Sequence, residues 1–173
     1  MKLKPELIKS EVVCKNIKPY IESGSIIILF DDIIGSGNSI IKWFKKSLPS
    51  TGFDSGSYQI LLDHIYILSF AGNIQAKSNI SSKINIDLSH IQFSETFDED
   101  DKVFSDKNWT NLLDFRDKIQ DFLHKNDEKF WNGYEECGLP VIFDWTSPNV
   151  SIGLYWNIFK LGEKEWYPLF PRN

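Results

Sequence analysis

The sequence contains few of the residues that form disulfides or bind structural metal ions in small folds. It contains only Cys14 and Cys137, which stand far apart, and no CxxC motif or Cys/His cluster. This spacing gives no support for a disulfide framework or a zinc knuckle. His64, His90 and His124 show no metal-ligand spacing, so we expect structural or surface roles for them. A reducing cytoplasm is the expected location.

Long apolar runs and an excess of basic charge are also missing. The longest apolar stretches are interrupted by Asp31, Asp63 and His64, well short of the roughly 18–20 residues that cross a bilayer. Met1–Ser10 has no hydrophobic segment of the kind that a secretory signal carries. With 19 Lys and Arg against 24 Asp and Glu, the net charge of -5 repels nucleic-acid backbones. We expect a soluble protein without a membrane or nucleic-acid partner.

The apolar content is sufficient for one ordinary core. The 173 residues are 42% hydrophobic and 14% aromatic, which predicts a single domain over residues 1–173. Strand-like and helix-like patterns alternate along the chain, which favours an α/β fold with a mainly parallel sheet flanked by helices. The expected elements are strands at 25–30, 65–70, 83–93 and 139–145 and helices at 38–48 and 108–125.

Three of these elements carry further expectations. The run at 25–30, Ser-Ile-Ile-Ile-Leu-Phe, is apolar on both faces and predicts a central strand covered on both sides. The alternation at 83–93 predicts a strand near a sheet edge. The helix at 108–125 is expected to bury one apolar stripe. That stripe comprises Leu112, Phe115, Ile119, Phe122 and Leu123.

The most informative stretch is Ile27–Ser39, where a strand leads into a loop of small residues. Asp31 and Asp32 end the apolar run, at a position where carboxylates can accept hydrogen bonds from vicinal hydroxyls. The small residues then allow backbone N–H groups to converge on one anion at a helix N-terminus. They are Gly35, Ser36, Gly37, Asn38 and Ser39. Together the two parts predict a sugar-phosphate site.

Other phosphate-binding patterns do not fit, and one alternative without a ligand stays open. The stretch lacks the spacing of a P-loop, Gly-x-x-x-x-Gly-Lys-Ser/Thr, and that of a dinucleotide fingerprint, Gly-x-Gly-x-x-Gly. A strand that ends in two aspartates before a Gly/Ser loop can also serve simply to cap a helix.

The stretch resembles the thirteen-residue fingerprint of type I phosphoribosyltransferases. In that fingerprint four apolar strand residues precede two acidic residues, two aliphatic residues and a Thr/Ser/Gly-rich loop. The resemblance implies that Asp31 and Asp32 hold the ribose hydroxyls of phosphoribosyl pyrophosphate (PRPP). It also implies that residues 35–39 wrap the 5'-phosphate and that magnesium accompanies the pyrophosphate. Purine-type members place an acid where Gly35 stands, so proton transfer by that route is not expected here.

The C-terminal third resembles a narrower group, the PRTase-CE family of bacterial conflict systems. The resemblance lies in residues 133–156, from Gly-Tyr through Leu-Pro-Val-Ile-Phe-Asp-Trp, and in residues 166–172, Trp-Tyr-Pro-Leu-Phe-Pro-Arg. It implies an antiphage or toxin-type setting. Complete phosphoribosyltransferases bind pyrophosphate through a strand and turn upstream of the fingerprint. Only 24 residues precede the strand here and show no such turn, so the resemblance implies a fold that lacks much of the usual N-terminal part.

Two functions that use a ligand stay open on this basis, beside a purely structural partner whose loop is empty. One is an active phosphoribosyltransferase, a glycosyltransferase whose catalytic and metal-binding residues the sequence does not identify. The other is a non-catalytic nucleotide or PRPP sensor, or an assembly subunit that needs a partner chain to supply the missing half-site. In both cases the expected ligand is a small molecule that contains a phosphoribosyl group.

Several other residues have a structural interpretation beside a functional one. Asp98–Asp101 can hold a divalent cation, but a solvated loop is the better interpretation because the spacing is not that of a calcium loop. Lys42, Lys45 and Lys46 face away from the apolar side of their helix, as ordinary surface lysines do. Cys137 stands beside an acid, so a packing role is favoured. For the aromatic residues, base stacking, core packing and partner contacts stay open. They are Trp145, Tyr155, Trp156, Trp166 and Tyr167.

Overall fold

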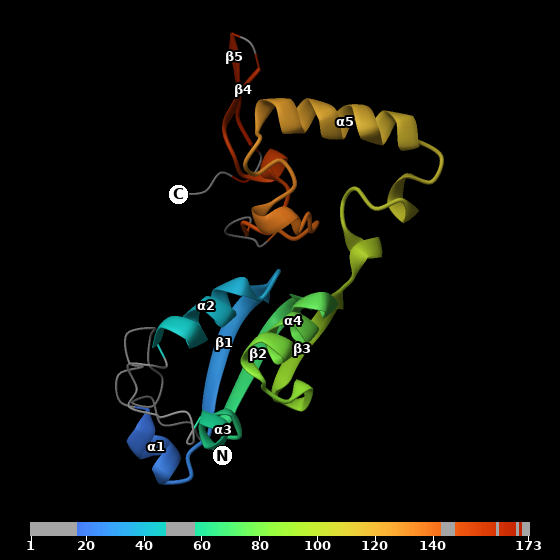
Figure 1. The fold of residues 1–173 in the computed structure, drawn as a ribbon. Coiled ribbons are helices and arrows are strands. Elements are labelled where there is room, and N and C mark those ends of the chain that lie inside the picture. The colour runs from blue at the N-terminus through green and yellow to red at the C-terminus, as the bar shows by residue number, and fades with distance from the viewer. Residues whose placement is uncertain (1–16, 48–57, 143–147, 162, 169, 171–173) are drawn as a thin grey trace. The chain divides into compact units, whose positions relative to one another are not determined.

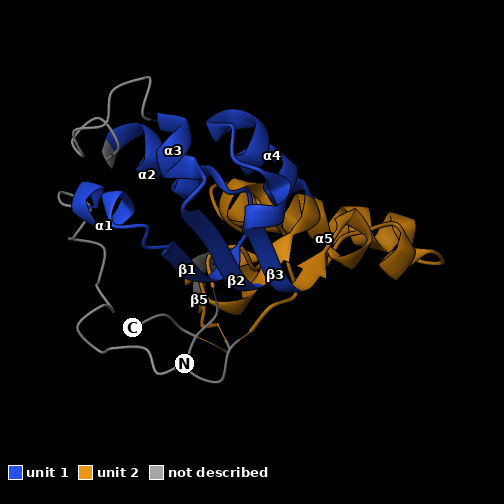
Figure 2. Cartoon of the chain, turned by 90° about the horizontal axis from the view of Figure 1, so that it is seen from below, with its two compact units in different colours: residues 1–70, 75–94 blue, residues 71–74, 95–173 orange. Residues whose placement is uncertain are grey.

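The computed structural model describes residues 17–47, 58–142, 148–161, 163–168 and 170. Two compact units make up the chain (Figure 2). Unit 1 comprises residues 1–70 and 75–94, and unit 2 comprises residues 71–74 and 95–173. The single domain over residues 1–173 stays a prediction. Among the described residues, no helix has the length and apolar character needed to cross a lipid bilayer.

A parallel three-stranded sheet with flanking helices confirms the α/β fold (Figure 1). Its strands, in the spatial order β1-β2-β3, are β1 (Ile27–Ile34), β2 (Ile65–Asn73) and β3 (Ile91–Phe97). The helices are α1 (Lys18–Glu22), α2 (Asn38–Ser47), α3 (Tyr58–Leu62) and α4 (Ile74–Ile84). The crossovers through α2–α3 and through α4 are those that parallel strands require.

The core of unit 1 lies between the sheet and its helices. Alternate strand residues such as Ile65 and Ile67 pack against Phe44 of α2 and Ile80 of α4, and all four side chains are fully buried. Ile84, one turn after Ile80, continues the same apolar stripe of α4 into this cluster. The core therefore fixes α2 and α4 on the same face of the sheet.

The position of the first strand differs from the prediction. β1 is an edge strand of the described sheet, and on its other face Ile28 and Phe30 are 54% and 64% exposed. Phe70 of the neighbouring strand is 63% exposed and meets Phe30 edge-to-face, with ring centroids 5.6 Å apart. The expectation of a central strand covered on both sides is therefore wrong for the described chain, because both crossovers progress in one direction and leave β1 at the end.

The prediction of a strand at 83–93 is also wrong for the first half of that range. Residues up to Ile84 belong to α4, and β3 begins only at Ile91. Between them Asp87 caps a short 3-10 turn by accepting a hydrogen bond from the Ser89 amide at 2.7 Å. Ile84 and Ile86 are both buried, so the alternation in the sequence marks a helix end and a turn rather than one strand.

Unit 2 contains one long helix and a short hairpin. The helix is α5 (Leu113–Asn126), and β4 (Phe159–Leu161) pairs antiparallel with β5 (Lys164–Trp166). Of the stripe predicted for α5, Leu123 is buried. The expectation of a fully buried stripe is wrong, since Leu112, Phe115 and Phe122 are about half exposed. α5 therefore uses only a narrow side for packing.

The strand predicted at 139–145 is reduced to a single contact. Leu139 forms an isolated parallel bridge with Ser151, and its amide donates to the Val150 carbonyl at 3.0 Å. Residues 143–147 lie outside the described part of the chain. What the structure describes of this segment is therefore a bridge rather than a strand.

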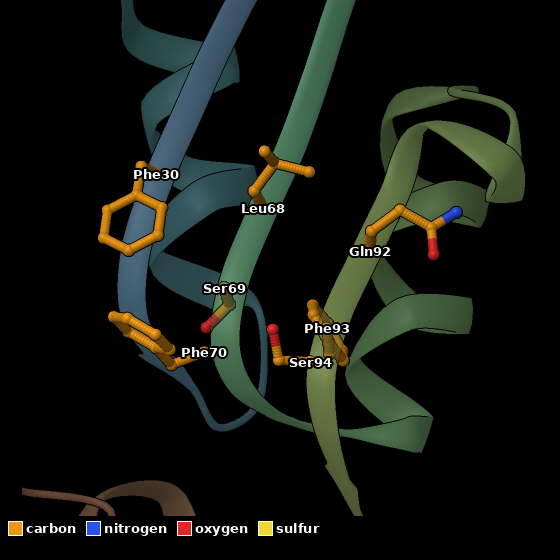
Figure 3. A pocket seen from close by; sticks show the side chains of 7 residues that line it. All are labelled: Phe30, Leu68, Ser69, Phe70, Gln92, Phe93 and Ser94. Carbon is orange, nitrogen blue, oxygen red and sulfur yellow. The ribbon is translucent and has the colours of Figure 1, made fainter.

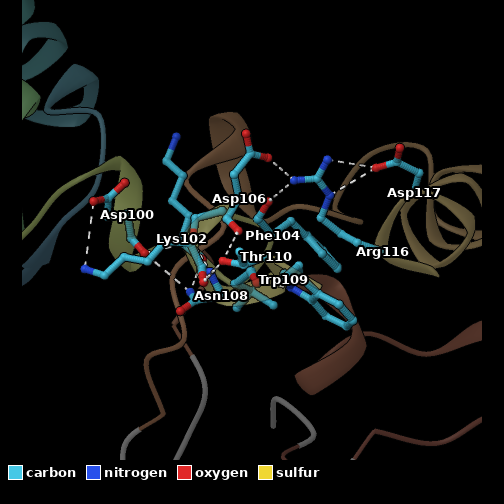
Figure 4. Close-up of polar contacts among 12 residues, drawn as sticks. Asp100, Lys102, Phe104, Asp106, Asn108, Trp109, Thr110, Arg116 and Asp117 are labelled. Atoms are coloured by element: carbon cyan, nitrogen blue, oxygen red, sulfur yellow. Dashed lines mark hydrogen bonds and ion pairs between the residues drawn. The ribbon is translucent and has the colours of Figure 1, made fainter. Parts of the chain in front are cut away.

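Side-chain contacts hold the segment before α5 (Figure 4). The guanidinium of Arg116 bonds the carboxylates of Asp106 and Asp117. The Trp109 indole donates to the Val103 carbonyl at 2.7 Å. These contacts order a stretch that has no regular hydrophobic period.

The acidic run at 98–101 acts locally as a helix cap. Asp98 accepts from the Asp100 amide at 2.8 Å, and Asp101 accepts from the Asp98 amide at 3.0 Å. Glu99 pairs with Lys102 at 2.9 Å. These bonds give the acids a structural role, in agreement with the loop interpretation.

Asp127 ends α5 as a buried hub of unit 2. It is 8% exposed and accepts from the Asn157 side-chain amide at 2.9 Å and from the Phe130 backbone amide at 3.2 Å. A buried carboxylate with donors on both oxygens stabilises the surrounding structure, because removing it leaves the Asn157 amide without this acceptor.

We predict that Asp127→Ala lowers the free energy of unfolding by about 1–2 kcal/mol, since the part-buried Asn157 amide loses its acceptor while the Phe130 amide keeps the Asp127 backbone carbonyl at 3.3 Å. Asp121→Ala, an exposed position on α5, is the matched control and should change it by less than about 0.5 kcal/mol. Urea denaturation followed by circular dichroism measures both. Equal effects would show that Asp127 is not a hub.

Candidate functional site

The predicted site residues lie where β1 passes into α2. Asp31 and Asp32 occupy the second half of the strand, the bend at 35–37 follows, and Asn38 begins the helix. This is the carboxyl end of a parallel strand, where α/β sheets bind their ligands. All seven predicted residues belong to unit 1.

Gly37 sets the shape of the bend. Its φ of 78° is in the left-handed region, and a Cβ there would stand 2.6 Å from Cγ1 of Ile80 in α4. Its carbonyl accepts the Ile41 amide at 3.1 Å and so starts the hydrogen bonding of α2. Only glycine satisfies both the backbone angle and the close approach to α4.

The side chain of Asn79 in α4 holds the same bend through a hydrogen bond. The Asn79 amide donates to the Ser36 carbonyl at 2.9 Å, and the Ser36 hydroxyl lies 3.3 Å from the Asn38 amide that donates to it. Asn79 is thus a positioning residue for the bend. Sequence reasoning missed it because α4 was not recognised, and no spacing relative to Asp31 and Asp32 points to it.

The start of α2 is electrostatically suited to an anion. A helix leaves the N–H groups of its first turn without intrahelical acceptors, and its N-terminal end carries partial positive charge. α2 has no acidic residue in its first turn, while Lys45 and Lys46 lie in its last turn. These two lysines are about 10 Å along the axis from Asn38, so the bend itself must supply the contacts to an anion there.

The two carboxylates brace the strand end and still face solvent. Asp31 Oδ1 accepts the Asp32 amide at 3.0 Å, and Asp32 Oδ1 accepts the Ile33 amide at 2.9 Å. Both residues are exposed, and a carboxylate has about four acceptor positions. Each group therefore keeps acceptor capacity for hydroxyls of a ligand.

Asp31 has an unusual proton affinity. Desolvation, followed by hydrogen bonding and charge repulsion from Asp32, raises the pKa of Asp31 from 3.8 to about 6, against a smaller lowering by the Asp32 amide. Two neighbouring carboxylates are costly to ionise together. Hydroxyl donors or a cation beside Asp31 would favour its charged form.

The site suits magnesium that arrives with a ligand. Across the described ranges, no three or more His, Cys, Asp or Glu side chains are grouped to hold a metal ion. Magnesium commonly uses one or two carboxylates together with substrate phosphates. Asp31 and Asp32 fit that limited part, and bound magnesium would neutralise charge on a pyrophosphate group.

A hollow lies among residues from the middle of the three strands (Figure 3). Its volume is about 220 Å³. Its lining residues are Phe30, Leu68, Ser69, Phe70, Gln92, Phe93 and Ser94. The Ser69 hydroxyl of β2 donates to the Asp32 carbonyl at 3.2 Å, which ties β2 to the second half of β1.

His64, His90 and Cys137 make contacts typical of packing residues. His64 Nδ1 lies 2.8 Å from the Ile60 carbonyl, and His90 stacks on Tyr66 with centroids 4.3 Å apart. Burial raises the pKa of Cys137 to about 11, which opposes formation of a thiolate. The packing role predicted for Cys137 agrees with its 4% exposure.

The C-terminal aromatic residues lie in unit 2 and make several kinds of contact. Trp156 is buried and donates to the Ser151 carbonyl at 3.1 Å, which is a core role. Tyr167 is 69% exposed and donates to Glu165 at 2.7 Å. Trp145 lies outside the described residues.

Paired acids in the second half of a parallel strand, followed by a glycine bend that opens a helix, are the arrangement that a phosphoribosyltransferase-like α/β protein is expected to have. The comparison with family models agrees: the PRTase-CE model matches residues 2–172. The chain therefore belongs to the PRTase-CE family. Neither the search of curated proteins nor that of solved structures returned a match.

We predict that Gly37→Ala lowers the free energy of unfolding by about 2–4 kcal/mol, because left-handed strain adds to a clash with Ile80. Gly24→Ala separates the two causes. Gly24 has a φ of 77° and nothing within 4 Å of its Cβ position, so we expect about 1 kcal/mol. Thermal unfolding measures both variants, and equal losses would contradict the close packing on α4.

We predict a pH-dependent stabilisation by Asp31→Asn in the ligand-free protein. Because the folded-state pKa is raised, the stability that Asp31 contributes is complete below its usual 3.8 and is lost as pH rises through about 6. The variant should therefore gain about 1 kcal/mol above pH 7, a modest value since solvent screens exposed carboxylates. The gain should vanish near pH 4.

Urea denaturation at both pH values measures this gain. Asp121→Asn, which removes an exposed charge from α5, is the matched control and should show no such pH profile. A gain for Asp31→Asn that is independent of pH would contradict the raised pKa.

Proposed function

We propose that this protein binds a 5'-phosphoribosyl ligand, either PRPP or a nucleotide, through residues 31–39. The observation that carries the proposal is the glycine bend at the start of α2, which Ile80 and Asn79 hold in shape. Backbone amides of such a bend recognise phosphate, and Asp31 and Asp32 accept hydrogen bonds from the ribose hydroxyls. Magnesium enters with the pyrophosphate group.

The biological setting that we propose is a bacterial antiphage or conflict system in the cytoplasm. Membership of the PRTase-CE family supports it. A protein partner that supplies the pyrophosphate half-site belongs to the same proposal. In an active enzyme the reaction is transfer of the phosphoribosyl group with release of pyrophosphate.

A non-catalytic sensor of nucleotide or PRPP is the second candidate. Gly35 offers no side chain to accept a proton from a base, which favours binding without transfer. Incubation with PRPP, magnesium and a panel of bases separates the two candidates. Pyrophosphate release supports the enzyme, whereas PRPP binding without release supports the sensor.

We predict that Ser36→Glu weakens binding of ribose 5-phosphate by at least about tenfold, because it brings a negative charge to the phosphate position. Ser78→Glu places the same charge on an exposed position of α4 and is the matched control. Isothermal titration calorimetry measures both, with circular dichroism as the check on folding. Unchanged affinity in Ser36→Glu would remove the site assignment.

We also predict a split between ligands for the double variant Asp31→Asn, Asp32→Asn. Loss of both carboxylates should weaken ribose 5-phosphate while leaving inorganic phosphate largely unaffected, because only the sugar meets the acids. Calorimetry with the two ligands measures this. Equal loss for both would show that the carboxylates only support the backbone.

A further inference from the structure

Ser69 is a buried polar residue on the core side of β2. Along this strand Ile65 and Ile67 point into the core, and because side chains alternate along a strand, Ser69 is the next residue to point the same way. Its side chain is buried, with 4% exposure, and a buried hydroxyl costs free energy unless it is hydrogen-bonded. A small apolar residue would fill this position without that cost, so the hydroxyl indicates a role beyond packing.

The hydroxyl of Ser69 bonds the strand that carries the two acids. It donates to the backbone carbonyl of Asp32 in β1 at 3.2 Å, and it points toward β1 (Figure 3). Both residues belong to unit 1. Regular pairing of parallel strands uses backbone groups from both strands. This bond from a side chain therefore adds a contact to the sheet at the level of Asp32.

The same peptide group also binds the Asp32 carboxylate. The carbonyl of Asp32 and the amide of Ile33 belong to one peptide group, which is planar and rotates as a unit. The Ile33 amide donates to Asp32 Oδ1 at 2.9 Å. Ser69 thus bonds the carbonyl end of this group, and the carboxylate bonds its amide end. The orientation that Ser69 gives the peptide group therefore determines where the Asp32 carboxylate lies.

We propose that Ser69 is a positioning residue for Asp32 and sets, through the peptide group of residues 32 and 33, where that carboxylate meets the ribose of the ligand. This inference rests on the proposed function, in which Asp32 accepts hydrogen bonds from the ribose hydroxyls. A binding group that is held in place before the ligand arrives loses less entropy on binding. Asn79 holds the bend for the phosphate, so each half of the ligand has a supporting side chain from a neighbouring element.

Isothermal titration calorimetry of Ser69→Ala tests the proposal. The variant should weaken binding of ribose 5-phosphate at least about threefold, because Asp32 loses its preset position, and should change binding of inorganic phosphate by less than about twofold. Ser81→Ala is the matched control, since the Ser81 hydroxyl of α4 also donates to a backbone carbonyl of unit 1, that of Ile86 at 2.8 Å. The control should leave the affinity for both ligands unchanged.

A double-mutant cycle shows whether Ser69 acts through Asp32. In an Asp32→Ala background, Ser69→Ala should cause no further loss of affinity for ribose 5-phosphate, because effects of residues that act through one another do not add. A general structural effect of Ser69→Ala would persist in that background. Equal losses in the two backgrounds would overturn the proposal, and so would wild-type affinity in Ser69→Ala.

Amide hydrogen exchange of the ligand-free protein separates this proposal from the proposed function. Ser69→Ala should speed exchange of the Ile33 amide at least about fivefold, because its peptide group loses an anchor, whereas Ser81→Ala should not. Ser69→Cys keeps nearly the same shape with a weaker donor, so it should show the same effects and replaces the alanine variant if that one does not fold.

The two possible failures are distinct. A wild type that does not bind ribose 5-phosphate would overturn the proposed function. An Ile33 amide that exchanges as in the wild type when the Ser69 hydroxyl is removed would overturn the role of Ser69, whatever the wild type binds.

Discussion

The close approach of Gly37 to α4 is the contact on which the candidate site depends. A bend in the left-handed region, within reach of Ile80 and tied through Ser36 to Asn79, has little freedom to change shape. A phosphate site gains affinity when its amides are held in place before the ligand arrives, since the entropy of ordering them is already spent. α4 thus gives the loop its rigidity although no residue of α4 belongs to the fingerprint.

Beside this rigid bend lies a carboxylate pair in which Asp32 disfavours the charged form of Asp31. Desolvation, followed by hydrogen bonding and charge repulsion from Asp32, raises the pKa of Asp31 to about 6 in the ligand-free protein. Ribose hydroxyls or a divalent cation would relieve that repulsion.

The local parts of the site could be predicted from the sequence, whereas the contacts between distant segments could not. The order of strand, acids, bend and helix within residues 27–47 depends on neighbouring residues, and the structure keeps this order. The predicted strand end is wrong, however, because β1 continues through both acids to Ile34. Asn79 is 43 residues from Ser36, and no periodicity connects them. The helix that carries Asn79 was hidden because its serines and asparagines favour helices weakly.

Two other differences between the predicted and the observed fold have a common physical origin. The apolar run at 26–30 indicates burial on both faces, and the stripe of α5 indicates burial of a whole side, yet Phe30 and Phe115 are exposed. Apolar patterning reports which surfaces favour burial but does not say which surface covers them.

Amide NMR of the full chain during titration with ribose 5-phosphate tests the central claim most directly. The account predicts saturable shifts of the Gly37 and Ser39 backbone amides, together with the Asn79 side-chain amide that supports the bend. The amide signals of unit 2 residues, such as Leu123 and Trp156, should keep their chemical shifts. A saturable response confined to unit 2, or none at residues 35–39, would contradict the account.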